Sequence, residues 1–381
     1  LLASSAASDV YKRQVCKRYV ERGYGMSGIV NLLWFVLILG AIVIVHEFGH
    51  LLAAKKFGVY CKEFSIGMGP LLWQKQKGET AWSIRALPIG GFVAMAGEDE
   101  ESDEKDELDI PFERTLNGIK PWKQVIVMAA GAFMNVLLAW LIFIGITACQ
   151  GSVSVPPKPI VASVVENSPA QKAGFHVGDE IIRLENKSKK ETLTPDSTRE
   201  IMEFLQYYPG EITYTVLRDG KQVTLQGTAA FHKDENLYIL GIGYPQSAAK
   251  EISFWEAIPY GTQRMVSSVT SIMDSLGKLV RGVGLNNLSG PVGIFQITAQ
   301  TTQDGLLSTL ALIALLSVNV GIVNLIPIPI LDGGRIFIIL IETLIGKKLS
   351  ERMQSVIMMA GLLMIVGIMV LATWNDIVRL F

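Results

Sequence analysis

The sequence predicts a polytopic α-helical membrane protein with four spans and a small β-rich domain inserted between the second and third spans. Half of its 381 residues are hydrophobic and only 18% are charged, whereas soluble domains usually carry about a quarter charged residues. The apolar residues gather in four long uncharged runs, and the segment between the second and third runs has ordinary charge density. These observations define the fold class.

The overall charge argues against a nucleic-acid binder. Lys and Arg total 34 against 35 Asp and Glu, which gives a net charge of -1 without a basic stripe. The three cysteines are too few and too scattered for a disulfide framework or a cysteine-based zinc site.

The four uncharged runs cover residues 23–45, 125–150, 305–331 and 353–375. Each exceeds the roughly 20 helical residues that cross a hydrocarbon layer of ~30 Å. We assign the spans to residues 26–56, 125–149, 305–346 and 353–375, and read 336–345 as a continuation of the third. Residues 1–25 are read as an N-terminal extension to which we assign no function, and whether they are native is left open; Met26 is a candidate start, because it leads directly into the first span.

The loop at 57–124 has two parts. Residues 67–97 predict a β-hairpin, with strands at 71–76 and 80–85 around a Lys-Gly-Glu turn. Residues 98–109 form an acidic run that we interpret as a solvated loop.

Residues 156–245 predict the inserted domain, followed by a linker at 246–304. The expected elements of the domain are β-branched strands and one helix, at 160–165, 212–217, 222–226 and 198–207. Within the linker, residues 253–280 predict an amphipathic helix that lies on a surface or at the membrane interface.

The orientation follows from basic residues in a short loop. Lys347, Lys348 and Arg352 connect the third and fourth spans, so that loop should be cytoplasmic. Alternation then predicts that the hairpin loop is cytoplasmic and that the β-rich domain and both termini are outside.

The end of the first span carries the pentad His46-Glu47-Phe48-Gly49-His50. Histidines at i and i+4 share one helix face and can bind one Zn²⁺, and the adjacent carboxylate can take a proton from a water molecule that the metal acidifies. Lys55 marks the expected cytoplasmic boundary, about 13 Å beyond His46. Ionisable groups at that depth are functional candidates, and the alternative is a hydrogen-bonded histidine pair with no metal.

Asp332 is the candidate third ligand among the spans, because His176 and His232 belong to the outer domain. Pro327 and Pro329 interrupt the helix before it, and irregular backbone at membrane depth must face protein or a water-filled cavity. The alternative is that Asp332 only caps the helix that starts at Gly333.

Six segments carry a resemblance to a known family: HEFGH at 46–50, GMGP at 67–70, GGFVAMAGE at 90–98, AAGAFMNVLLA at 129–139, SGPVGI at 289–294 and NLIPIPILDGG at 324–334. Together they resemble the site-2 protease family of intramembrane zinc metalloproteases, in its bacterial branch of the regulator of sigma-E protease type. The resemblance covers nearly everything from Met26 onward. Ala132 is one departure, because many members have proline there.

The resemblance implies Zn²⁺ ligands at His46, His50 and Asp332, with Glu47 as the catalytic carboxylate. It also implies that Asn324 helps to hold the substrate backbone near the metal. The hairpin would dip into the membrane against an extended substrate, with four glycines as substrate-binding positions: Gly67, Gly69, Gly90 and Gly91.

The inserted domain looks like a single PDZ domain, on the basis of SPAQKAGFHVGDEII at 168–182. Its groove would capture a peptide, or the domain would exclude substrates with bulky outer parts. Both remain open.

The resemblance implies cleavage within transmembrane segments of single-span proteins, such as anti-sigma factors or remnant signal peptides. The chain is expected in the bacterial cytoplasmic (inner) membrane, with the active site in the membrane near the cytoplasmic side. The alternatives are a membrane-tethered PDZ adaptor with a vestigial metal site and a zinc transporter. The complete His, Glu, His and Asp set argues against the adaptor, and the absence of ionisable residues in the second and fourth spans argues against a transport path.

Overall fold

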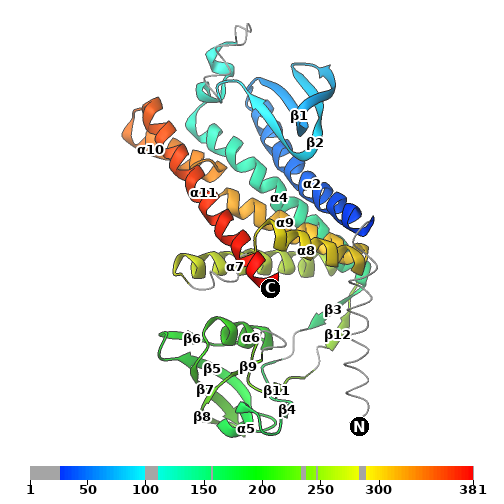
Figure 1. Ribbon diagram of the computed structural model, residues 1–381, viewed down its shortest axis with the longest axis vertical. Helices are drawn as coiled ribbons and strands as arrows, with labels where there is room; N and C mark the ends of the chain where they lie inside the picture. The colour runs from blue at the N-terminus through cyan, green and yellow to red at the C-terminus, as the bar shows by residue number, and fades with distance from the viewer. Residues whose placement is uncertain are drawn as a thin grey trace. The chain divides into compact units, whose positions relative to one another are not determined.

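The computed structural model describes residues 26–98, 110–155, 158–232, 237–245, 248–282 and 289–380. The expectations for residues 1–25, and for the acidic run beyond Glu98, lie outside these residues. The chain divides into two compact units (Figure 1). We call Thr147–Ala257 with Lys278–Gly284 the β-rich unit, and the remainder the helical unit.

The helices that lie wholly or mostly in the helical unit are α2 (Met26–Lys56), α4 (Pro121–Gln150), α7 (Ala257–Val280), α8 (Pro291–Thr301), α9 (Leu306–Asn324), α10 (Asp332–Ile345) and α11 (Glu351–Leu380). Within the described residues, four helices are long and apolar enough to cross a membrane: Gly28–Lys56, Pro121–Gln150, Leu306–Asn324 and Arg352–Val378. The predicted polytopic helical membrane protein is thereby confirmed.

The predicted third span consists of two helices. Helix α9 ends at Asn324 and α10 begins at Asp332, so the apolar stretch at 336–345 belongs to a separate helix. Pro327 and Pro329 lie in the connection, where each removes a backbone donor that a continuous helix would need. The break frees the chain to turn at the level of the histidine pentad.

Helix α4 packs closely against both α2 and α9. A Cβ atom on Gly49 of α2 would lie 2.3 Å from the carbonyl oxygen of Ala130, and one on Gly321 of α9 would lie 3.0 Å from that of Ala132. Small residues at such crossings let the backbones of membrane helices approach each other. The histidine face of α2 therefore lies directly against α4.

Strands β1 (Cys61–Lys77) and β2 (Thr80–Met95) pair antiparallel through a turn at Gly78. Both are longer than the strands expected at 71–76 and 80–85. The predicted strands are too short because β1 and β2 continue through bends, and these bends interrupt the regular alternation of polar and apolar side chains.

Glycines make these bends. Gly67 and Gly69 in β1 have φ of 88° and 84°, and Gly90 in β2 has φ of 80°. These are left-handed values that glycine adopts without steric cost. As a result, residues 63–66 pair on one side with 91–94 and on the other with 81–84.

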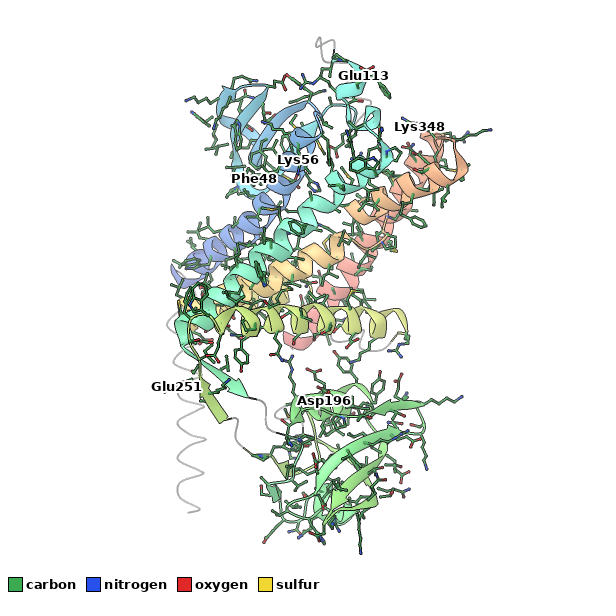
Figure 2. The ribbon with its side chains drawn as sticks, turned by 180° about the vertical axis from the view of Figure 1, so that it is seen from behind. Phe48, Lys56, Glu113, Asp196, Glu251 and Lys348 are labelled. Carbon is green, nitrogen blue, oxygen red and sulfur yellow. The ribbon has the colours of Figure 1, made fainter. Side chains whose placement is uncertain are left out.

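A buried core joins this sheet to α2 and α4. Figure 2 labels Phe48 and Lys56 on α2, and the Phe48 ring meets the Phe64 ring of β1 edge-on, with centroids 6.2 Å apart. The buried members are Leu51, Ala54, Val59, Cys61, Phe64, Val93, Met95, Leu116, Ile119, Val127 and Met128. This core holds β2 beside the end of α2 that carries the pentad.

Helix α7 corresponds to the amphipathic helix expected at 253–280. One face of α7, including Met265, Val269 and Ile272, packs against apolar residues of α4 and α9. Other side chains, such as Val266 and Met273, are exposed. The helix is therefore packed on other helices along one side.

The β-rich unit contains a four-stranded sheet in the order β6-β5-β7-β8. Its strands are β5 (Glu180–Asn186), β6 (Glu191–Leu193), β7 (Glu211–Arg218) and β8 (Lys221–Thr228). Three short pairs join β3 (Ser152–Val155) to β12 (Ala248–Glu251), β4 (Ser163–Val164) to β11 (Ile242–Gly243), and β9 (Ala230–His232) to β10 (Leu237–Ile239).

Two short helices complete this unit, α5 (Pro169–Ala173) and α6 (Thr198–Tyr207). Helix α6 has the bounds expected from the sequence, because its apolar residues recur at helical spacing and enter the core. Ser168 caps α5 by accepting a hydrogen bond from the Gln171 backbone N–H, and Gly174 ends α5 with φ of 85°.

Candidate metal centre

Two histidines near the C-terminal end of α2 form one side of the site. His46 and His50 are one helical turn apart, and their exposed fractions are 5% and 4%. Their rings occupy space left by Gly131 of α4, where a Cβ atom would lie 2.4 Å from His50 Nε2 and 2.7 Å from His46 Nε2. A glycine at this position of α4 thus makes room for both rings.

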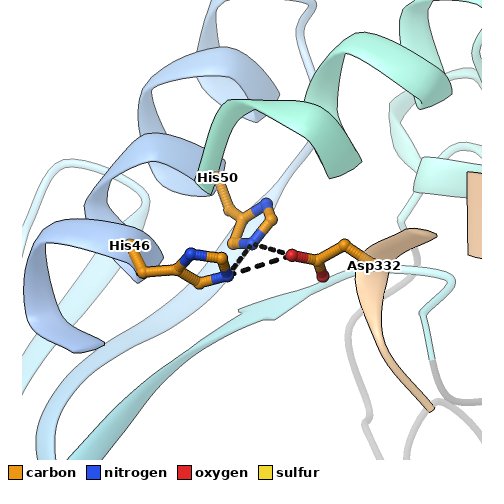
Figure 3. A group of neighbouring side chains, drawn as sticks. All are labelled: His46, His50 and Asp332. Atoms are coloured by element: carbon orange, nitrogen blue, oxygen red, sulfur yellow. Dashed lines mark hydrogen bonds and ion pairs between the residues drawn. The ribbon is translucent and has the colours of Figure 1, made fainter. Parts of the chain in front are cut away.

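Asp332, the first residue of α10, brings a carboxylate to the same point (Figure 3). Its Oδ2 lies 3.0 Å from His46 Nε2 and 3.4 Å from His50 Nε2. The two Nε2 atoms are 3.2 Å apart. The start of α10 has no side-chain cap, so the aspartate carboxylate faces the histidines instead of capping its own helix.

Close backbone packing holds Asp332 in place. Cβ atoms on Gly333 and Gly334 would each lie 2.3 Å from backbone atoms of the preceding connection, so that connection can fold directly under the start of α10. Arg335 pairs with the Glu98 carboxylate and donates to the Glu98 carbonyl oxygen at 3.0 Å. The start of α10 is thereby tied to the end of the β1–β2 sheet.

The hydrogen bonds of His50 show which of its ring nitrogens faces the cluster as an acceptor. His50 Nδ1 lies 2.8 Å from the Val127 carbonyl oxygen, which can only accept, so Nδ1 carries the hydrogen. In a neutral imidazole the other nitrogen is then an acceptor. His50 Nε2 therefore points a lone pair at another ring nitrogen and a carboxylate oxygen.

This arrangement fits a tetrahedral zinc ion. Zinc bonds of about 2.0–2.1 Å place neighbouring ligand atoms roughly 3.3 Å apart, and the three separations here are 3.0, 3.2 and 3.4 Å. Within the described residues, His46, His50 and Asp332 are also the group whose donor atoms could hold a metal ion. A cation among them would relieve the repulsion between the His50 Nε2 lone pair and the Asp332 carboxylate.

Glu47 lies beside this cluster without joining it. Its Oε2 accepts a hydrogen bond of 3.2 Å from the Val93 backbone N–H in β2. One oxygen of the carboxylate is thus held by the sheet.

The structure brings Asn324, at the end of α9, to the same centre. Its Nδ2 lies 3.2 Å from His46 Nε2. The four glycines named from the sequence lie in the β1–β2 sheet, where they have a local role: Cβ atoms on Gly67 and Gly91 would lie 2.5 and 2.7 Å from carbonyl oxygens of the neighbouring strand segments. None of these glycines belongs to the metal-ligand group.

Sequence reasoning assigned no role to several groups that touch the site. These are Asn135, whose side chain meets His46, and the backbone groups of Val127 and Val93. A lone asparagine in an uncharged span was a usable signal, because a polar side chain in such a span needs a partner. The backbone groups of Val127 and Val93 cannot be recognised as partners from the sequence, because every residue has such groups.

A cluster of two histidines and an aspartate, with a glutamate beside it on an apolar helix, is the set of residues that a membrane metallohydrolase requires. The chain matches the model of Peptidase family M50 over residues 34–368. It therefore belongs to that family, which confirms the resemblance to the site-2 proteases and, with relatives named as zinc metalloproteases, the prediction of a zinc metallopeptidase.

Curated relatives align over nearly the whole chain. The regulator of sigma-W protease RasP of Bacillus subtilis is 31% identical over 423 residues, which cover 91% of this chain and 98% of the relative. Zinc metalloprotease RasP of Shouchella clausii is 32% identical over 428 residues, with 92% and 99% covered. A Clostridium perfringens relative is 35% identical over 349 residues, with 91% and 98% covered.

Proposed function

We propose that this zinc metalloprotease hydrolyses peptide bonds within transmembrane segments of other membrane proteins. The observation that carries the proposal is the spacing of 3.0 to 3.4 Å among His46 Nε2, His50 Nε2 and Asp332 Oδ2. Two relatives named as zinc metalloproteases and the family membership support the choice of metal.

His46, His50 and Asp332 would bind the zinc. When bound, the ion supplies Lewis acidity that polarises the substrate carbonyl and favours deprotonation of water. Glu47 takes the proton from the attacking water and delivers it to the leaving amine, with its carboxylate held by the Val93 N–H. The Asn324 amide, close to His46 Nε2, holds the substrate carbonyl beside the metal ligands.

A transmembrane substrate must unwind before its peptide bonds are accessible. Residues 91–95 form an edge of the β1–β2 sheet beside Glu47, and an unwound segment that adds to this edge satisfies its own backbone groups. We infer that the sheet is membrane-associated, because it exposes many large apolar side chains: Ile66, Met68, Leu71, Leu72, Trp73, Ile84 and Leu87. Gly67, Gly69, Gly90 and Gly91 would shape this substrate path.

The β-rich unit is proposed to be a single extracytoplasmic PDZ domain that captures a peptide or excludes bulky substrates. Lys347 and Lys348 follow Gly346, which caps the C-terminal end of α10, and these basic residues support a cytoplasmic position for that end of the helix. The chain would then lie in the bacterial cytoplasmic membrane, with its site toward the cytoplasmic side. The relative named as a regulator of sigma-W protease favours single-span anti-sigma factors as substrates, and remnant signal peptides have the same form.

The test compares purified parent protein with Glu47→Gln on a model single-span substrate, each with and without a zinc chelator. We expect the parent to cleave only without chelator. The variant should cleave about 100- to 10,000-fold more slowly, the usual contribution of a general base, and should keep its zinc. Equal cleavage by both proteins would contradict the role of Glu47. Substrate binding by a folded, zinc-loaded parent that never cleaves would favour the adaptor.

A further inference from the structure

The second ring nitrogen of His46 has a buried side-chain partner that the proposed mechanism does not use. Asn135 of α4 is fully buried, with 0% exposure, and its Nδ2 lies 3.3 Å from His46 Nδ1. No donor among the described residues reaches Asn135 Oδ1. A buried amide oxygen without a donor is costly. A rotation of the amide that brings Oδ1 to a donor is therefore favoured.

The two histidines can be compared at this nitrogen. His50 Nδ1 faces the Val127 carbonyl oxygen at 2.8 Å, an acceptor whose polarity is fixed. His46 Nδ1 faces the Asn135 amide, which offers an oxygen or a nitrogen depending on its rotation. Val127 and Asn135 are eight residues apart on α4, about two helical turns. One helix therefore contacts the outer nitrogen of both rings.

The chemistry of a metal ligand decides the rotation at His46. A ring that binds a metal through Nε2 carries its hydrogen on Nδ1, and that hydrogen needs an acceptor. The Asn135 nitrogen cannot accept, whereas a half-turn of the amide exchanges nitrogen for oxygen. This turn also gives the oxygen the donor that it otherwise lacks.

We propose that Asn135 is a positioning residue of the metal centre, whose side-chain oxygen accepts the His46 Nδ1 hydrogen and so keeps His46 Nε2 free to bind zinc. This inference rests on the zinc site proposed above. Asn135 would do for His46 what the Val127 carbonyl does for His50.

Asn135 is firmly held from the other side. The Ser317 hydroxyl of α9 donates to the Asn135 backbone carbonyl at 2.8 Å, and a Cβ atom on Gly321 would lie 3.4 Å from the Asn135 Cβ. The Asn135 amide can rotate about the Cβ–Cγ bond, but the backbone and Cβ of Asn135 are fixed between α2 and α9.

The experiment measures zinc affinity by chelator competition on the detergent-purified full chain, for Asn135→Leu, Asn135→Ala and Asn135→Asp. Loss of an outer partner of a metal-bound histidine typically weakens metal binding 10- to 100-fold, so we expect that loss for Leu and Ala. Asp offers an accepting oxygen and should bind zinc within about threefold of the parent or more tightly. The visible spectrum of the cobalt-substituted proteins should follow the same order, because it reports the ligand geometry.

The pattern separates positioning from packing. Leu matches Asn in the number and branching of its side-chain heavy atoms, so a packing role predicts that Leu keeps the affinity and that a buried Asp loses the fold. Unchanged affinity in Asn135→Leu would overturn the proposal, as would a folded Asp variant that loses zinc like Leu. If Asp does not fold, Leu and Ala decide alone.

Two controls keep the failures distinct. Ser317→Ala removes the contact to the Asn135 backbone but leaves the amide, and it should bind zinc like the parent. A parent protein that binds no zinc would refute the zinc site itself. A parent that binds zinc with the same affinity as Asn135→Leu would refute only the role of Asn135.

Discussion

Two aspartates, one in each unit of the molecule, have opposite environments. Asp179 of the β-rich unit is 0% exposed and takes hydrogen bonds of 2.7 Å to each oxygen from Arg218, with a third from the His176 backbone. Asp332 of the helical unit is 19% exposed and faces two histidine Nε2 atoms. Asp179 therefore has its cation within the chain, whereas Asp332 faces two histidine ring nitrogens, of which His50 Nε2 is an acceptor.

This difference teaches how a structural carboxylate can be told from a functional one. A buried carboxylate paired with arginine and a backbone donor is electrostatically satisfied. The carboxylate at Asp332 lies 3.4 Å from the His50 Nε2 lone pair, since His50 uses its hydrogen on Val127, and a cation between them would stabilise both groups. The comparison predicts that replacing Asp332 affects metal binding and that replacing Asp179 affects folding.

The largest expected effect is that of Asp332→Ala on zinc retention. Removing a direct ligand should cost more than the 10- to 100-fold of an outer partner, so we expect at least about a 100-fold loss of zinc affinity. Cleavage should fall with it, while thermal unfolding changes little. The measurement is zinc content after a chelator challenge.

Asp376 provides the matched control, because it is a buried carboxylate in the same unit. It accepts from the Gly293 backbone N–H at 2.8 Å at the start of α8, and Asp376→Ala should keep its zinc. Unchanged zinc in Asp332→Ala would remove Asp332 from the ligand set. Equal zinc loss in both variants would make the effect a general one of buried charge.

The second effect is that of Asp179→Ala on the stability of the β-rich unit. Breaking a buried pair typically costs about 3–5 kcal/mol, and because Arg218 keeps 24% exposure we expect about 2–3 kcal/mol. Hydrogen exchange of β5 and β7 amides in the full chain measures it. Zinc content should not change.

The control for this prediction is Asp196→Ala, at an exposed aspartate of the same unit. Its effect should stay within about 0.5 kcal/mol, as for ordinary surface positions. Zinc loss in Asp179→Ala would contradict the division of roles between the two aspartates, and so would unchanged exchange protection.

Much of the architecture follows from local sequence patterns. Spans can be predicted from runs of uncharged residues, and the spacing of His46 and His50 places both rings on one helix face before any tertiary structure exists. Helix α6 of the β-rich unit could also be predicted from local sequence, because the spacing of its apolar residues defines its bounds.

The remaining features depend on contacts between distant segments. The separation of α9 from α10 follows the two prolines, but the approach of Asp332 to His46 across 286 residues depends on how α2, α4 and α10 pack. Residues 63–66 pair with both 91–94 and 81–84 because glycines bend the strands. The alternation of polar and apolar residues along a strand does not predict such bends. The contact of Asn135 with His46 depends on the close crossing of α2 and α4. Gly49 permits this crossing, but the glycine alone does not allow the crossing to be predicted from the sequence.

The smallest expected effect is the pH dependence of the Asp179 pair. Burial alone would raise the pKa of the Asp179 carboxyl, but the hydrogen bonds from Arg218 and from the His176 backbone lower it below its ordinary value of 3.8. A carboxyl with a lowered pKa in the folded state stabilises fully above its ordinary pKa, and the contribution fades as the pH falls from there toward the lowered value.

The β-rich unit of the parent should therefore lose part of the 2–3 kcal/mol only below about pH 4. Asp179→Asn carries no titrating group there, so its hydrogen-exchange stability should fall less between pH 5 and pH 3 than that of the parent. Other carboxyls, such as Glu256, titrate in both proteins, and the difference between parent and variant isolates Asp179. Identical slopes would mean that the Arg218 pair does not favour the charged form, and the contrast with Asp332 would then rest on geometry alone.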